Sequence, residues 1–148
     1  MRSDAIKSGP DRAPARAMLL AAGRDRAAIE RPLVAVVHTW SDVSPCNLNL
    51  RELAQHARAG VEAAGGTAIE FNTIAVTDGI AMRTAGMRAS LVSRDWIADS
   101  IELAVDGHSL DAMVLLVGCD KTIPAAAMAA ARLGVPSVEC HRRTRAQS

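Results

Sequence analysis

The feature that most constrains the fold is an alternation between unbroken apolar runs and segments with helical spacing of apolar residues. Leu33–Val37 and Met113–Val117 are continuous apolar runs, as in strands that are buried on both faces. Ile69–Val76 and Val135–Val138 are two further strand candidates. Strands that alternate with helices over short loops favour parallel pairing through right-handed crossovers. The sequence therefore predicts an α/β fold, a three-layer domain of βαβ units around a parallel sheet.

The segments between the apolar runs carry helix start and stop signals. Apolar residues recur at helical spacing from Leu50 to Ala64, and Gly65–Gly66 is expected to end that helix. Ser93 is a candidate N-cap for a second helix. Pro124 suits the first turn of an Ala-rich helix that Gly134 would stop. Three helices are thus predicted between the four strands.

The composition limits both the core and the partners. Of the 148 residues 49% are hydrophobic, which is enough for a real core, but 2% are aromatic, so aliphatic side chains must fill the interior. The methionines interpreted as further core filler are Met82, Met87, Met113 and Met128. A formal net charge of +1 gives no indication of nucleic-acid binding. No apolar run approaches the roughly 20 residues of a membrane span, and a cytoplasmic location is expected.

The chain divides into three parts by composition. Residues 1–31 are rich in Arg, Asp, Gly and Pro and are interpreted as an N-terminal arm with one short helix, Ala13–Gly23. Residues 32–138 are expected to form the α/β domain. Residues 139–148 are polar and basic and are interpreted as a separate tail.

Chemically versatile side chains lie in the three loops that follow the first three strands. In parallel sheets, ligands bind beyond the carboxyl ends of the strands, where these loops meet. The first loop carries Cys46, the second carries Asp78, and the third carries Cys119, Asp120 and Lys121 in succession. Two thiols, two carboxylates and a lysine are therefore expected to converge at one edge of the sheet.

Thiolates favour soft metals and iron–sulfur clusters, whereas carboxylates favour Mg²⁺ or Ca²⁺, so this mixture suggests two metal centres of different character. Each residue also has a plainer interpretation. A loop cysteine is often a small buried filler, Asp78 before a glycine suits a turn, and Asp120 could cap a helix. Lys121 resembles a phosphate-binding lysine, but the P-loop pattern is missing.

The strings SPCNLNL, EFNTIAVTDGI, SRDWIADSIE and GCDKTIPAAAMAAARLGVPSV occur in this order, after GPDRAPARAML in the arm. Together they resemble the dihydroxy-acid dehydratases, a family of hydro-lyases. The resemblance covers about Arg2 to Val138. It implies the dehydration of 2,3-dihydroxy-3-methyl acids to 2-keto acids in branched-chain amino acid biosynthesis, and a small dihydroxy acid as substrate. It also implies a homodimer or homotetramer for a full-length chain.

The resemblance assigns roles to the loop residues. Cys46 and Cys119 match two of three cysteine ligands of an iron–sulfur cluster, for which [2Fe–2S] is favoured over [4Fe–4S]. Asp78 and Asp120 match magnesium ligands. Lys121 matches a lysine that binds Mg²⁺ as its carbamate. The catalytic base of the family would lie outside this chain, so no catalytic residue is assigned.

Three departures from the family pattern bear on activity. A third cluster cysteine is expected further downstream, and Cys140 is not at its place. Arg83 stands in a loop where the family has a small residue. After Val138 the sequence no longer resembles the family, which is interpreted as an artificial end such as a frameshift or gene-model error. This chain is therefore expected to be inactive alone. The alternatives are a fragment of a sugar-acid dehydratase, for example one acting on arabinonate, a non-catalytic metal- or anion-binding α/β module, and a structural remnant.

Overall fold

A parallel sheet forms the centre of the computed structural model, which describes residues 1–141. Its four strands lie in the order β2-β1-β3-β4, and every neighbouring pair is parallel. The strands are β1 (Leu33–His38), β2 (Thr67–Asn72), β3 (Ala112–Val117) and β4 (Ser137–His141). This confirms the predicted α/β class, and each of the four predicted strand segments overlaps an observed strand.

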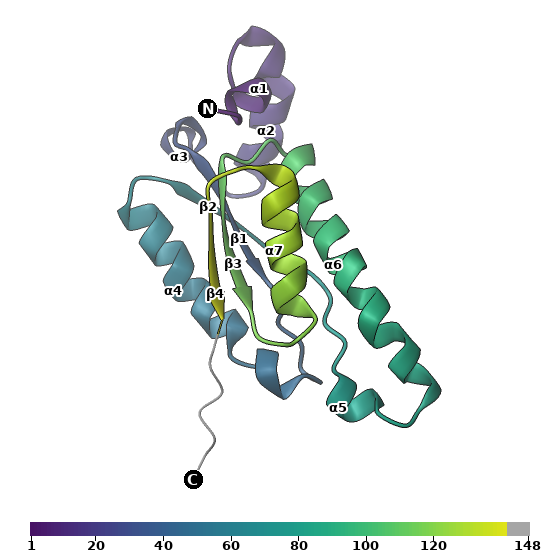
Figure 1. The fold of residues 1–148 in the computed structure, drawn as a ribbon. Helices are drawn as coiled ribbons and strands as arrows, with labels where there is room; N and C mark the ends of the chain where they lie inside the picture. Colours follow the sequence, from purple (N-terminus) through teal and green to yellow (C-terminus); the bar gives the residue numbers. More distant parts are fainter. Residues whose placement is uncertain (142–148) are drawn as a thin grey trace.

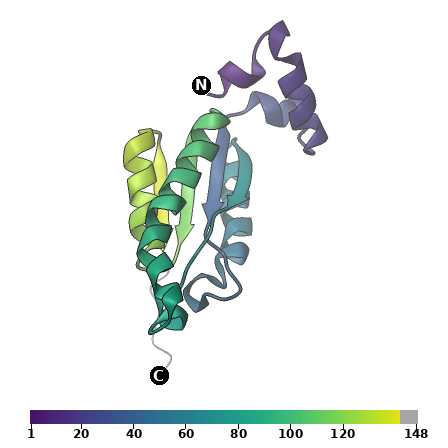
Figure 2. The ribbon, with the colours of Figure 1, turned by 90° about the vertical axis from the view of Figure 1, so that its right-hand side faces the viewer.

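Helices cover both faces of the sheet, which makes the domain three-layered. Helix α4 (Leu50–Ala63) packs on one face, against β1, β2 and β3. Helices α6 (Arg88–Gly107) and α7 (Thr122–Leu133) pack on each other over the opposite face. Figure 2 shows α6 and α7 on one side of the strands and α4 on the other. The α7 helix ends as predicted, with Gly134 in the left-handed conformation at φ 61°.

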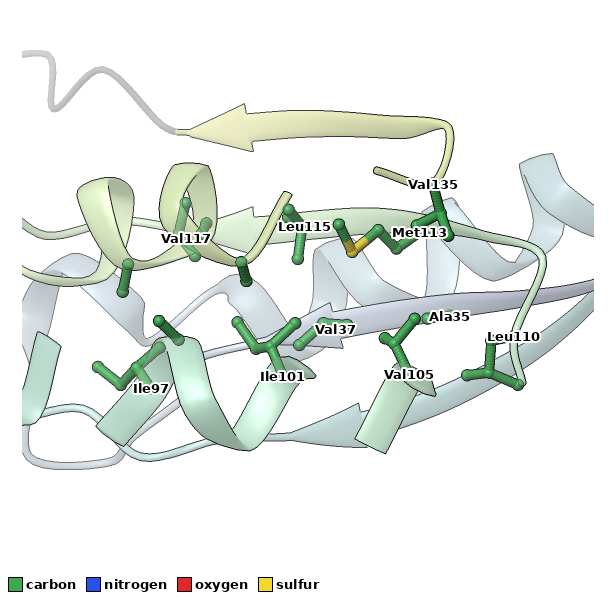
Figure 3. Packing of buried hydrophobic residues seen from close by; sticks show 14 of the residues in the cluster. Ala35, Val37, Ile97, Ile101, Val105, Leu110, Met113, Leu115, Val117 and Val135 are labelled. Carbon is green, nitrogen blue, oxygen red and sulfur yellow. The ribbon is translucent and has the colours of Figure 1, made fainter. Parts of the chain in front are cut away.

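Two apolar clusters hold these layers together. The larger cluster lies between the sheet and α6/α7, where side chains of β1 and β3 meet Ile97, Ile101 and Val105 of α6 (Figure 3). The smaller cluster lies on the α4 face and contains Val36 and Leu50. Burying each such aliphatic side chain stabilises the fold by about 1.5–3 kcal/mol. Burial on both faces explains why β1 and β3 read as unbroken apolar runs.

The N-terminal arm lies at the amino-terminal end of the strands (Figure 1) and has more helix than the sequence indicated. Its elements are α1 (Asp4–Lys7), η1 (Pro10–Arg12), α2 (Ala13–Ala21) and α3 (Arg26–Glu30). The prediction of a single helix over Ala13–Gly23 was therefore incomplete. Helices of four or five residues are too short to show a periodic pattern.

Asp111 fastens the arm to the sheet. Its carboxylate accepts hydrogen bonds from the backbone N–H of Ser3 at 2.9 Å, the Ser3 hydroxyl at 2.5 Å and the backbone N–H of Leu33 at 2.8 Å. Burial acts to raise the pKa of Asp111, but the Ser3 and Leu33 hydrogen bonds outweigh it and hold that pKa below the ordinary value. The arm and the first strand thus share one ionised side chain.

Two predicted element boundaries were wrong. Strand β2 ends at Asn72 rather than Val76, because β1 ends at His38 and offers no further pairing positions. Ser93 does not cap a helix, since α6 already begins at Arg88 after the turn η3 (Ala85–Met87). The Ser93 hydroxyl instead donates to the Ser90 carbonyl at 2.6 Å, within the helix.

Two of the four methionines were also assigned wrongly. Met113 lies in the core and Met128 packs against it, but Met82 is 59% exposed and Met87 is 38% exposed. At the other end, regular structure continues to His141, so the first residues of the predicted tail 139–148 belong to β4. The remaining tail residues lie outside the described part of the chain. In residues 1–141, none of the helices combines the length and apolar character of a membrane span.

Candidate functional site

The loop after β1 and the loop after β3 touch at the carboxyl end of the sheet. The first loop folds into the turn η2 (Pro45–Asn47) and the second begins at Gly118. A Cβ atom at Gly118 would lie 2.3 Å from the Cys46 carbonyl oxygen and 2.6 Å from Oδ1 of Asn47. Only a residue without a side chain allows this approach, which places Cys46 beside the residue that follows Gly118.

Thr122 fixes the shape of the second loop. Its buried Oγ1 accepts the backbone N–H groups of Gly118 at 3.2 Å and Cys119 at 2.9 Å. The same side chain begins α7, so the loop is closed at the first turn of the helix. The position of Cys119 is thereby set by β3, by the helix and by one hydroxyl.

The thiols of Cys46 and Cys119 are neighbours at this end of the sheet. Cys119 is buried, Cys46 is partly exposed, and the Ser44 hydroxyl lies 3.8 Å from the Cys119 sulfur. Burial raises the pKa of the Cys119 thiol, and the neighbouring Cys46 thiol raises it further. Two adjacent thiols at the mouth of a rigid loop can serve together as soft ligands.

A second group of polar side chains gathers around Lys121. Its ammonium donates to Oδ2 of Asp78 at 3.0 Å and also to the carboxylate of Asp120. Asp78 is the first residue of the short helix α5 (Asp78–Ala81), so the contact joins the loops after β2 and β3. Lys121 and Asp78 are mostly shielded, with side chains 18% and 21% exposed, whereas Asp120 is 62% exposed.

The charges in this group stabilise one another. The hydrogen bond from Lys121 holds the pKa of Asp78 below its ordinary value. The hydrogen bonds to Asp120 and Asp78 raise the pKa of Lys121. The Lys121 ammonium lies between the two carboxylates, where their negative charges would also attract a bound metal cation.

The structure therefore brings the predicted residues together in two sets, Cys46 with Cys119 and Asp78 with Lys121 and Asp120. Their roles as metal ligands stay predictions. Asp120 does not cap α7, since its N-cap is Lys121 and makes no side-chain cap bond. Within residues 1–141, no three side chains among His, Cys, Asp and Glu come together in a geometry that could hold a metal ion.

The sequence analysis predicted no role for four residues that support the site. They are Ser44, Asn47, Gly118 and Thr122. A glycine directly after a buried strand and before a cysteine is a usable signal of close backbone approach. The amide of Asn47 had no such signal. It is fully buried, and in the described residues neither its oxygen nor its nitrogen has a hydrogen-bond partner. A buried, unpaired amide beside Cys46 fits a site that accepts a further group.

Two other features lie near the site without joining it. His38 contacts Glu70 through Nε2 at 3.2 Å, and Arg58 donates to the other oxygen of Glu70 at 2.9 Å. Arg83 adopts a left-handed backbone with φ 63°, which is uncommon for a residue with a side chain. Glycine adopts such a conformation without strain.

Comparison with known proteins identifies relatives that share the sequence of these loops. The family model described as "Dihydroxy-acid/6-phosphogluconate dehydratase N-terminal" matches residues 31–141. A protein of Koribacter versatilis named dihydroxy-acid dehydratase is 55% identical over 137 residues, which cover 93% of this chain and 24% of the relative.

Two further proteins with the same name give similar values. A Thermus thermophilus protein is 56% identical over 93% of this chain and 25% of its own length. The Roseiflexus sp. (strain RS-1) protein is 53% identical over 91% of this chain and 24% of its own length. The chain thus spans about a quarter of the length of the curated relatives it matches. With the family model covering most of its length, the chain belongs to the dihydroxy-acid/6-phosphogluconate dehydratase family.

Proposed function

We propose that this chain is the N-terminal part of a dihydroxy-acid dehydratase, which converts 2,3-dihydroxy-3-methyl acids to 2-keto acids in branched-chain amino acid biosynthesis. The observation that carries the proposal is the meeting of a thiol pair and a carboxylate–lysine group at one edge of the sheet. The relatives named dihydroxy-acid dehydratase support the choice of reaction.

Cys46 and Cys119 would hold the iron–sulfur cluster. Their thiols are neighbours, and the close approach of the two loops at Gly118 keeps them so before any metal arrives. The raised pKa of Cys119 means that its thiol is protonated in the absence of metal, and binding must displace that proton. When bound, the cluster supplies a Lewis-acidic iron for the substrate hydroxyl that leaves.

Asp78, Asp120 and Lys121 would hold Mg²⁺. The two carboxylates are hard oxygen ligands of the kind Mg²⁺ prefers. The ammonium of an unmodified Lys121 is paired with both carboxylates and offsets one of their two charges, so it must move aside or lose its charge before a cation can bind between them. Carbamylation does the latter and converts the donor into an oxygen ligand. Carbamylation would therefore turn the present ion-pair network into a cation site.

The thiol pair and the carboxylate–lysine group would also determine where a substrate binds. The thiol pair and the carboxylate–lysine group are joined through consecutive residues, Cys119, Asp120 and Lys121, so their separation is fixed by one short loop. A small acid bound between them would be held in a single orientation, which lowers the entropic part of the barrier. This chain supplies binding and orientation.

Anaerobic reconstitution with iron and sulfide tests the cluster assignment. We expect visible absorption and bound iron in the wild-type chain, and a loss of at least five-fold in Cys46→Ser and Cys119→Ser. Cys140→Ser is the matched control, because Cys140 is exposed on β4 and belongs to neither loop, and it should retain wild-type iron. Equal iron content in all three variants would refute the assignment.

Activity is a separate measurement. Because the chain covers about a quarter of its relatives' length, we expect no 2-keto acid from the reconstituted chain alone. Formation of 2-keto acid from 2,3-dihydroxy-3-methylbutanoate by the pure 148-residue chain would contradict this expectation.

A further inference from the structure

A polar hollow lies between α4 and the carboxyl ends of β1 and β2, and we call it the α4 hollow. Its volume is about 390 Å³, and small-molecule sites usually occupy roughly 300–1,000 Å³. Helix α4 begins at this end of the strands (Figure 1), and its side chains Arg51 and Arg58 line the hollow opposite the sheet. The cysteines and the carboxylate–lysine group of the candidate site do not line it.

The strands place polar side chains in the hollow because successive residues of a strand point to opposite faces. Val36 and Ala68 belong to the apolar cluster on the α4 face. His38 and Glu70 each lie two residues further along the same strands, so they point to the same face. Apolar packing on this face therefore gives way to polar side chains at the carboxyl end of the sheet, where parallel sheets bind ligands.

Glu70 is fully engaged within the hollow. Nδ1 of His38 accepts the backbone N–H of Trp40 at 3.4 Å, so the ring proton is on Nε2, which donates to Glu70 at 3.2 Å. Arg58 donates to the other carboxylate oxygen at 2.9 Å. Burial acts to raise the pKa of Glu70, but the hydrogen bonds from Arg58 and His38 outweigh it and hold that pKa below the ordinary value. Arg58 and Glu70 are thus a matched ion pair beside a neutral imidazole.

Arg51 adds a charge that is not matched. Its guanidinium stacks on the ring of Trp40, 4.8 Å from the ring centroid, and within residues 1–141 no carboxylate is paired with it. The acidic residues of α4 and of the loop before it are Asp42, Glu52 and Glu62, which are exposed and do not line the hollow. The lining side chains therefore present two guanidinium charges and one carboxylate, which leaves one positive charge.

The two arginines are placed to bind one anion together. Seven residues make nearly two turns, so Arg51 and Arg58 leave α4 in almost the same direction, about 10 Å apart along the helix axis. Arg58 uses Nη1 for Glu70 and keeps its other donors available. Arg51, stacked flat on Trp40, keeps the N–H groups at the edge of its guanidinium available. These planar donor forks match the geometry of a carboxylate.

We propose that the α4 hollow binds a small organic acid through a single carboxylate, held by Arg51 and by the donors of Arg58 that Glu70 leaves free. A monocarboxylate balances the one unmatched positive charge. A phosphate dianion would instead bring excess negative charge beside Glu70. The proposal goes beyond the proposed function, since this binding site needs neither a metal nor the dehydration reaction.

Titration of the metal-free 148-residue chain with 3-methylbutanoate tests the proposal, with the indole N–H signals of its two tryptophans as the NMR readout. This acid has one carboxylate and none of the hydroxyl or keto oxygens of the dehydration reaction. The Trp40 signal should move and saturate with a dissociation constant of about 1 mM, as for a ligand of few atoms. Trp96 lies on α6, over the other face of the sheet, and should move less than one-fifth as far.

The uncharged 3-methylbutanamide is the matched control ligand, and it should leave the Trp40 signal in place. An equal shift with the amide, or no saturable shift with the acid, would overturn the proposal.

Arg51→Gln tests the role of the unmatched guanidinium and should weaken binding of 3-methylbutanoate at least ten-fold. Because Arg51 is exposed, urea unfolding should stay unchanged, so a loss of binding is not a loss of fold. Arg132→Gln is the matched control, since Arg132 is exposed on α7, over the other face of the sheet, and pairs with Asp99 at 2.7 Å. Equal affinities in the two variants would contradict the assignment.

Inorganic phosphate tests the class of anion. It should bind at least ten-fold more weakly than 3-methylbutanoate, and phosphate binding of equal strength that also depends on Arg51 would refute the monocarboxylate assignment. Cys119→Ser, which should lose iron, should bind the acid as the wild type does. Failure of acid binding would therefore leave the proposed function standing, and failure of the metal assignments would leave the acid site standing.

Discussion

Gly118→Ala is the substitution that most directly tests the geometry of the site. The added Cβ would lie 2.3 Å from the Cys46 carbonyl oxygen, about 1.1 Å closer than ordinary van der Waals contact at 3.4 Å. The obstacle is backbone rather than the flexible end of a side chain, and Asn47 Oδ1 at 2.6 Å blocks a second direction. The turn η2 must therefore move away from β3 by about an ångström.

The loss of folding stability in Gly118→Ala follows from that displacement. Overpacking a tight site typically costs 1–3 kcal/mol, and a rigid backbone obstacle puts Gly118→Ala near the upper limit, about 3 kcal/mol. For a chain of this size this corresponds to a fall in Tm of roughly 10 °C. The same movement separates the Cys46 and Cys119 thiols, so bound iron after reconstitution should fall at least five-fold as well.

Gly60→Ala is the matched control for Gly118→Ala. Gly60 lies within α4, and a Cβ there would meet nothing within 4 Å. This change should stabilise the chain by about 0.5–1 kcal/mol, because alanine has the higher helix propensity. Urea unfolding monitored by circular dichroism gives both values. If Gly118→Ala unfolds at the same urea concentration as Gly60→Ala and binds wild-type iron, the close approach of the two loops does not exist.

Two further substitutions test contacts that stabilise the fold away from the site. Asp111→Asn should cost about 2 kcal/mol in urea unfolding, because it removes a charged acceptor shared by Ser3 and Leu33. Since the pKa of Asp111 is lowered on folding, its contribution is present above the unfolded value near 3.8 and is lost as the pH falls through the folded value. The difference between wild type and Asp111→Asn should therefore shrink below about pH 4, and a full difference at pH 2 would contradict the assignment. Gly134→Ala should cost about 1 kcal/mol because of its left-handed backbone at φ 61°, whereas Gly107→Ala, without positive φ or a neighbour within 4 Å, should cost nothing.

The sheet and its order of elements could be predicted because burial on both faces leaves a direct mark in the sequence. Nearly all side chains of Leu33–Val37 and Met113–Val117 pack in one of the two apolar clusters, on one face of the sheet or the other, which is why both runs are apolar throughout. Parallel pairing then forces the following loops to one edge, which is why the convergence of Cys46 with Cys119 could be expected. The set of side chains that meet at the site could therefore be predicted from the order and direction of the strands.

What failed depended on neighbours that are distant in sequence. The end of β2 depends on where β1 stops, and no signal in residues 67–76 contains that information. The arm is organised by Asp111, which lies 108 residues from Ser3. The buried amide of Asn47 depends on a glycine in another loop. In each case the missing information is a contact, which neither propensity nor periodicity describes.

The misplaced methionines have a different cause, which α6 makes clear. One side of this helix carries Ile97, Ile101 and Val105 at helical spacing, all fully buried against the sheet. Val92 and Trp96, also four residues apart, belong to another side and are more than half exposed. Apolar spacing shows that a face will be covered but not by what, since the cover can come from the same domain or from another surface. Met82 was interpreted as core because the chain has few aromatic side chains to fill its interior, and composition likewise does not show which surface covers a given side chain.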